Sequence, residues 1–79
     1  MELNDKASSV KDCPERSRLS AKVNEILQEL VELTKTQHEA FTSRDDAVFM
    51  RLDKTLELTI GRKERSIGAL RQHQQEHGC

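Results

Sequence analysis

The sequence has no tryptophan or tyrosine, and it holds two phenylalanines, one proline and three glycines among 79 residues. Hydrophobic residues make up 34% of the chain and charged residues another 34%, which excludes a thick globular core. A chain this short also buries so little surface that many need a metal, a disulfide or a partner subunit. The composition therefore favours long solvated helices that pack against another molecule.

A strong net charge is lacking too, because 13 lysines and arginines nearly balance 14 aspartates and glutamates. No global field of the chain attracts nucleic acid or an anionic membrane. No run approaches the roughly 20 consecutive apolar residues of a membrane span, and residues 1–11 have no apolar centre of a secretory signal. The sequence predicts a cytoplasmic protein with no membrane partner.

What the sequence does have is helical periodicity. Apolar residues recur at alternating steps of three and four between positions 19 and 33, so they line one side of a helix. Leu27 and Val31 widen this stripe toward the broader face of a helix in a multi-helix bundle. The spacing predicts a helix over residues 14–42 with a seam of Leu19, Val23, Ile26, Leu30 and Leu33.

The start of this helix is marked by its capping residues. Pro14 suits the first turn, where its missing amide proton would have no helical partner, and Asp12 is the expected N-cap. Glu15 then stands in the capping-box position. We expect residues 1–11 to form a flexible tail and residues 12–79 to form one helical hairpin.

A reversal is expected near residues 43–45. Thr42 and Ser43 are good capping residues, and two aspartates follow that suit the positive end of a second helix. That helix is predicted over residues 46–77, with an apolar seam of Phe49, Leu52, Leu56, Ile60, Ile67 and Leu70. The alternative is one continuous helix of about 95 Å. Phe41 and Phe49 would pack together at the tip of the hairpin.

The fold prediction is thus an all-α, antiparallel two-helix hairpin that forms a four-helix bundle as a homodimer. Because one hairpin is too small to hide both stripes, the leading hypothesis is a non-enzymatic protein–protein interaction module. No base is placed beside a nucleophile in any motif of the sequence, so no enzyme is predicted. The predicted self-association interface consists of Val23, Ile26, Leu30, Leu33, Leu56, Ile60, Ile67 and Leu70.

A second hypothesis is a small chaperone or adaptor that receives an amphipathic client helix. It is motivated by Gly61 and Gly68, which lie one heptad apart inside a helix although each costs roughly 1 kcal/mol relative to alanine. Two glycines on one side would let another helix approach closely.

A minor alternative is a nucleic-acid-binding hairpin dimer. Arg62, Lys63, Arg65 and Arg71 form a basic patch in the second helix. No aromatic residues are interleaved with them, and neighbouring glutamates dilute their charge, so a solvated face is the favoured interpretation.

A third hypothesis is a metal- or redox-responsive helix pair. His73 and His77 are one turn apart, and in a hairpin Cys13 faces the region of Gln75, close to them and to Cys79. Such a set has the chemistry of a zinc site, although the spacing matches no standard finger. The other interpretations are unlinked thiols with histidines that cap the helix end, or a disulfide, either between Cys13 and Cys79 or between subunits. No other cofactor is expected.

The acidic turn at residues 45–46, followed by Leu52, Leu56 and the pair at residues 63–64, resembles the helical hairpins of small bacterial export chaperones and of plasmid RNA-binding four-helix dimers. The resemblance covers residues 19–70. It implies an architecture and transfers no functional residue.

Overall fold

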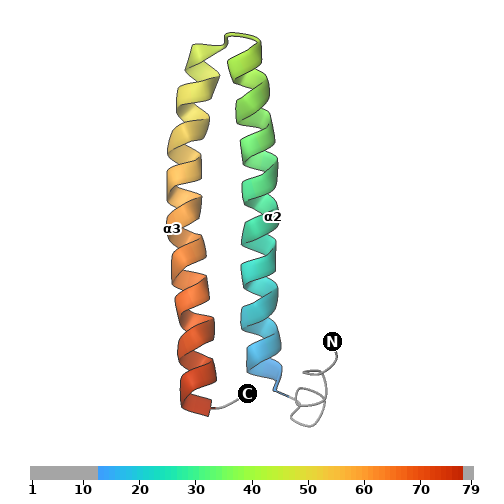
Figure 1. Ribbon diagram of the computed structural model, residues 1–79, viewed down its shortest axis with the longest axis vertical. Helices are drawn as coiled ribbons and strands as arrows, with labels where there is room; N and C mark the ends of the chain where they lie inside the picture. Colours follow the sequence, from blue (N-terminus) through green and yellow to red (C-terminus); the bar gives the residue numbers. More distant parts are fainter. Residues whose placement is uncertain (1–12, 78–79) are drawn as a thin grey trace.

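The computed structural model describes residues 13–77 as two long helices joined by a short turn (Figure 1). Helix α2 runs over Pro14–Thr42 and helix α3 over Asp46–His77. The two helices lie side by side and antiparallel, so the first residues of α2 are beside the last turns of α3 (Figure 1). The predicted all-α hairpin is confirmed, and one continuous helix is excluded. The predicted tail over residues 1–11 lies outside the described residues.

The N-cap position of α2 is held by Cys13, one residue later than predicted. Its backbone is extended, with φ −118° and ψ 92°, and its side chain makes no capping hydrogen bond. Extended backbone is the preferred state of a residue that precedes proline, and Pro14 holds the first helical position. Asp12 lies outside the described residues. The carboxylate of Glu15 accepts hydrogen bonds from Arg18.

The turn at residues 43–45 caps both the C-terminus of α2 and the N-terminus of α3. Arg44 has a φ of 61°, in the left-handed region, and the amide of Asp45 donates to the carbonyl of Ala40 at 2.9 Å. This is the hydrogen-bond pattern of a Schellman motif, in which the left-handed residue is usually glycine. Asp45 then caps α3, because its Oδ1 accepts from the amide of Val48 at 3.2 Å. The cap is therefore Asp45, and the hydroxyls of Thr42 and Ser43 bond back to α2.

The inner side of α2 is the seam that the periodicity predicts. Ile26 is 1% exposed and Ala40 6%, and the other seam residues are half-buried at steps of three and four. Every predicted apolar position of α2 faces α3 in this way. The seam of α2 consists of Arg16, Leu19, Val23, Ile26, Leu30, Leu33, Gln37 and Ala40.

The inner side of α3 is more polar than predicted. Its most buried residue is Thr59, 2% exposed, whose hydroxyl donates to the carbonyl of Thr55 at 2.8 Å. Because the hydroxyl is satisfied within its own helix, the methyl group can pack against α2. The seam of α3 includes Leu52, Thr55, Thr59, Arg62, Ser66 and His73. Four larger aliphatic residues of α3 are consequently turned toward one side of the hairpin, namely Leu56, Ile60, Ile67 and Leu70.

Candidate functional site

One side of the hairpin carries an apolar strip that we call the apolar flank. The rings of Phe41 and Phe49 lie 5.9 Å apart, which confirms their predicted contact, although Phe41 is 68% exposed. Residues seven or fourteen positions apart share one side of a helix. Leu27 therefore lies on the side of Phe41, and Leu56 and Leu70 on the side of Phe49. The apolar flank consists of Leu27, Val31, Leu56, Ile60, Ile67 and Leu70.

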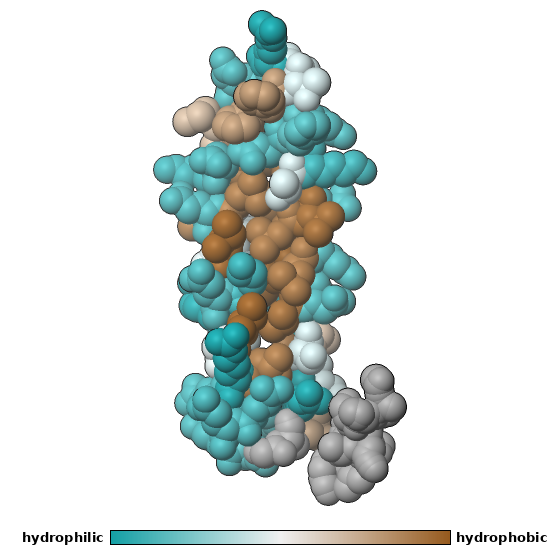
Figure 2. All heavy atoms as spheres, viewed as in Figure 1, coloured by the Kyte–Doolittle hydropathy of each residue, from teal (hydrophilic) through white to brown (hydrophobic). Residues whose placement is uncertain are grey.

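Much of the apolar flank is open to solvent. Leu27 is 42% exposed, Val31 63% and Ile60 41%, and the remaining members are half-buried. Figure 2 shows apolar side chains gathered in a stripe along both helices, bordered by hydrophilic residues. From Leu56 to Leu70 the strip is about 21 Å long and roughly one helix, or about 10 Å, wide. With the adjoining rings of Phe41 and Phe49 the apolar surface reaches roughly 300 Å², the scale of a patch that is often functional.

The opposite side of the hairpin is a charged flank, formed by Lys22, Glu29, Arg62 and Arg65. Arg62 spans the two helices, and its Nη1 donates to the carboxylate oxygens of Glu29 at 3.1 and 3.3 Å. Both side chains are more than 40% exposed, so the ion pair adds little stability. The contact shows which side of α3 lies next to Glu29, and the apolar flank is on the other side of the hairpin.

The predicted basic patch of α3 is divided between these two sides. Arg62 and Arg65 lie on the charged flank, whereas Lys63 is seven residues after Leu56 and belongs to the side of the apolar flank. Arg71 is exposed elsewhere on α3. The four cations therefore do not converge on one surface for nucleic acid.

Three of the four predicted metal-ligating residues meet at the end of the hairpin away from the turn. Nε2 of His73 lies 3.2 Å from Sγ of Cys13, and the rings of His73 and His77 are 4.7 Å apart. Cys13 is disulfide-bonded. Within residues 13–77, no three His, Cys, Asp or Glu side chains are arranged to hold a metal ion. Cys79, the fourth predicted ligand, lies outside the described residues.

Glu15 is a neighbour of this cluster. Its hydrogen bond from Arg18 lowers the pKa of the Glu15 carboxyl, and the charges of Arg18, His73 and His77 act in the same direction. A carboxyl group with a lowered pKa stabilises the fold above its ordinary pKa, and this contribution is lost as the pH falls through the lowered value. Because Glu15 and Arg18 are exposed, solvent screens the pair.

The glycines of α3 have no close neighbour from α2. A Cβ built on Gly68 meets nothing within 4 Å, and one built on Gly61 meets only Nη1 of Arg65, on the same helix, at 3.5 Å. The glycines predicted that another helix approaches α3 closely. Within the described hairpin, α2 does not approach α3 closely at Gly61 or Gly68.

We expect Gly68→Ala to stabilise the protein by about 1 kcal/mol, because alanine favours a helix and the space around it is open. The measurement is the thermal midpoint by circular dichroism at fixed protein concentration. A lower midpoint would contradict this expectation, since it would mean that another molecule occupies that space.

The sequence did not single out Thr59 or Ser66 as seam residues, nor Lys22 as part of a charged flank. The available signal was their heptad spacing, since Thr59 and Ser66 are seven residues apart and Lys22 precedes Glu29 by seven. A seam predicted from apolar residues alone does not include such polar positions.

Comparison with protein-family models, curated proteins and solved structures finds no match to this chain. Neither helix has a stretch, within residues 13–77, that is long and apolar enough to cross a membrane.

Proposed function

We propose that this protein is a non-enzymatic, cytoplasmic helical interaction module, and that two copies pack their apolar flanks together as a four-helix bundle. The observation that carries the proposal is the contrast between Thr59 and Ile60. The threonine is 2% exposed inside the hairpin, whereas the neighbouring isoleucine is 41% exposed. The hydroxyl of Thr59 is satisfied within its own helix, but the hairpin leaves much of Ile60 in water, and a second molecule that covers this side chain would add the favourable free energy of burying it.

The proposed contact surface differs in part from the set that the sequence suggested. Ile26 is 1% exposed and belongs to the seam inside the hairpin, together with the half-buried Val23, Leu30 and Leu33. The exposed residues of α2 that belong to the proposed contact surface are instead Leu27 and Val31. The contact is thus assigned to the six residues of the apolar flank.

A second copy is the partner that fits this surface best. The strip runs along both helices (Figure 2), so a hairpin laid against it presents an identical strip of the same length. Packing two such strips gives each helix two apolar neighbours, which is the arrangement of a four-helix bundle. Self-association also supplies the core that a chain of 79 residues lacks.

Light scattering after size-exclusion chromatography, over a concentration series of the full chain, tests this proposal. We expect a mass near twice the 9.1 kDa of one chain, falling toward one chain only on strong dilution. A folded, fully helical monomer at high micromolar concentration would contradict self-association. A monomer that becomes fully helical only when an amphipathic peptide is added would instead support the client-binding alternative.

The contact between Cys13 and His73 favours a second candidate function, a redox-responsive helix pair. Cys13, the N-cap residue of α2, is disulfide-bonded. Nε2 of His73 lies 3.2 Å from its sulfur. In the reducing cytoplasm this cysteine would be a thiol by default. Oxidation would then stiffen the open end of the hairpin, since the helix ends fray most easily there.

We expect Cys13→Ser, or a thiol reductant added to the wild type, to destabilise the oxidised protein by about 2 kcal/mol, the low end of the usual range because helix ends are involved. The measurement is the thermal midpoint with and without reductant, beside alkylation of thiols and elemental analysis for zinc. Equal midpoints with a fully alkylated Cys13 in the untreated protein would remove the redox candidate.

A further inference from the structure

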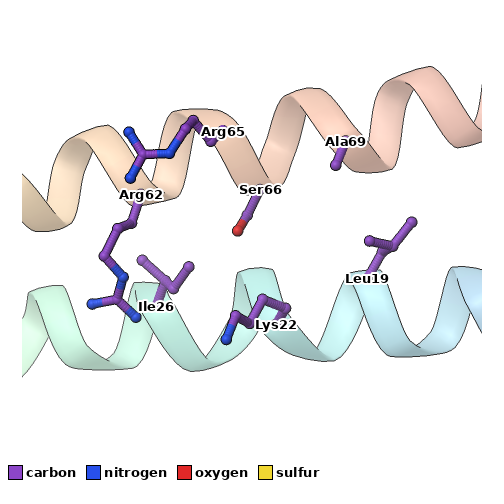
Figure 3. A pocket seen from close by; sticks show the side chains of 7 residues that line it. All are labelled: Leu19, Lys22, Ile26, Arg62, Arg65, Ser66 and Ala69. Atoms are coloured by element: carbon purple, nitrogen blue, oxygen red, sulfur yellow. The ribbon is translucent and has the colours of Figure 1, made fainter.

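The charged flank contains a hollow of about 280 Å³ between the two helices, lined by Leu19, Lys22, Ile26, Arg62, Arg65, Ser66 and Ala69 (Figure 3). It exists because α3 places the small side chains of Ser66 and Ala69 opposite α2, at the level where longer residues would fill the seam (Figure 3). We propose that this hollow binds a single phosphoryl group of a small molecule.

Charge is the first argument for this ligand. Three cationic residues from both helices line the hollow, Lys22 from α2 and the two arginines from α3. The guanidinium of Arg65 lies along α3 beside Gly61 and would turn toward a bound ligand. Only Arg62 has an acidic partner, Glu29; within residues 13–77 neither Lys22 nor Arg65 forms an ion pair. The three positive charges and one negative charge leave a net charge of +2, which matches a phosphoryl dianion. Arginine is also well suited to phosphate, since its guanidinium can donate two parallel hydrogen bonds.

The hydroxyl of Ser66 is the second argument. The half-buried Thr55 and the buried Thr59 both donate their hydroxyls to the carbonyl four residues earlier in α3. Ser66 is also half-buried, but in the described part of the chain its hydroxyl makes no such bond. Figure 3 shows it directed toward α2, into the hollow. It is therefore a donor that remains available for a ligand oxygen.

The surroundings of the hollow favour a small ligand over a nucleic-acid strand. Glu15 and Glu29 lie seven residues to either side of Lys22, and so on the same side of α2. Glu15 lines the adjoining surface hollow together with Glu76. A polyanion laid along this flank would meet carboxylates on both sides of the three cations, whereas one phosphoryl group would meet a single carboxylate, that of Glu29, which is already paired with Arg62.

This inference does not depend on self-association. The hollow lies on the charged flank, opposite the strip assigned to the second copy, so it stays accessible in a dimer. Failure of one proposal therefore leaves the other unchanged.

The test is a titration of the full, isotopically labelled chain with inorganic phosphate, followed by amide chemical shifts at constant ionic strength. We expect saturable shifts at Lys22 and Ser66. Arg65→Ala and Lys22→Ala should each weaken phosphate binding about tenfold, while Arg71→Ala, an exposed cation away from the hollow, should leave it unchanged. Helical content by circular dichroism checks that each variant is folded.

Two results would overturn the proposal. One is the absence of saturable shifts at the hollow at millimolar phosphate. The other is an equal loss of affinity with Arg71→Ala, which would indicate general attraction to positive charge. A short single-stranded RNA serves as the competing ligand, and tighter binding of RNA than of phosphate, with shifts spread along α3, would also contradict a single-phosphoryl site.

Discussion

Replacing Ile60 by glutamate is expected to raise the dissociation constant of the proposed dimer by about 100-fold or more. Ile60 lies in the middle of the apolar flank and is 41% exposed in the single hairpin, so the hairpin itself accommodates the change. Burying a fully exposed isoleucine contributes about 1.5–3 kcal/mol; a dimer would add the part of this that belongs to the 41% still exposed, and a symmetric dimer loses that part twice. A carboxylate at the same place also has to be desolvated. Sedimentation equilibrium of the variant measures the effect.

Leu58→Glu is the matched control for this experiment. Leu58 is a large aliphatic residue of the same helix, two positions away and 71% exposed, but it lies seven residues before Arg65 and so on the charged flank. We expect its dissociation constant to stay within about threefold of the wild-type value. Equal effects of the two substitutions would contradict the assignment of the contact to the apolar flank.

Replacing Ile26 by alanine is expected to destabilise the hairpin itself by about 2–5 kcal/mol, because this side chain is 1% exposed and its removal leaves a cavity in the seam. This is a large share of the stability of a small domain, which is about 5–15 kcal/mol. Urea unfolding followed by circular dichroism at one fixed protein concentration measures the loss, since dimer formation makes stability depend on concentration.

Met50→Ala provides the comparison for Ile26→Ala. Met50 is also in a helix, yet it is 63% exposed and outside both the seam and the apolar flank. Its substitution should change the free energy of unfolding by no more than about 0.5 kcal/mol. If Ile26→Ala were equally mild, the two helices would not be held together by the seam that the structure describes.

The helices and the side of α2 that faces α3 could be predicted from the sequence. Apolar steps of three and four from Leu19 to Leu33 define a single stripe, and that stripe is the seam. Pro14 and the acidic pair at residues 45–46 predicted where the helices begin. The closeness of Cys13 to His73 also followed, because a tight turn near Arg44 determines which residues of an antiparallel pair lie opposite one another.

The position of the turn was predicted, but its left-handed backbone and the rotation of α3 could not be predicted in the same way. Arg44 adopts a left-handed backbone that glycine usually supplies, so no sequence signal marked it. The apolar residues of α3 predicted a seam of Leu56 and Ile60, yet Thr59 is the residue buried there. A threonine whose hydroxyl bonds to its own helix packs like a small apolar residue, and hydropathy does not record this.

The central claim is that a second copy covers the apolar flank, and the most direct test is a nuclear Overhauser experiment on a mixture of methyl-labelled and unlabelled chains. The account predicts intermolecular contacts from the methyl groups of Ile60, Ile67 and Leu27, and none from Leu58. Intermolecular contacts that arise from Leu58, or a sample of dimer mass with none from the apolar flank, would contradict it.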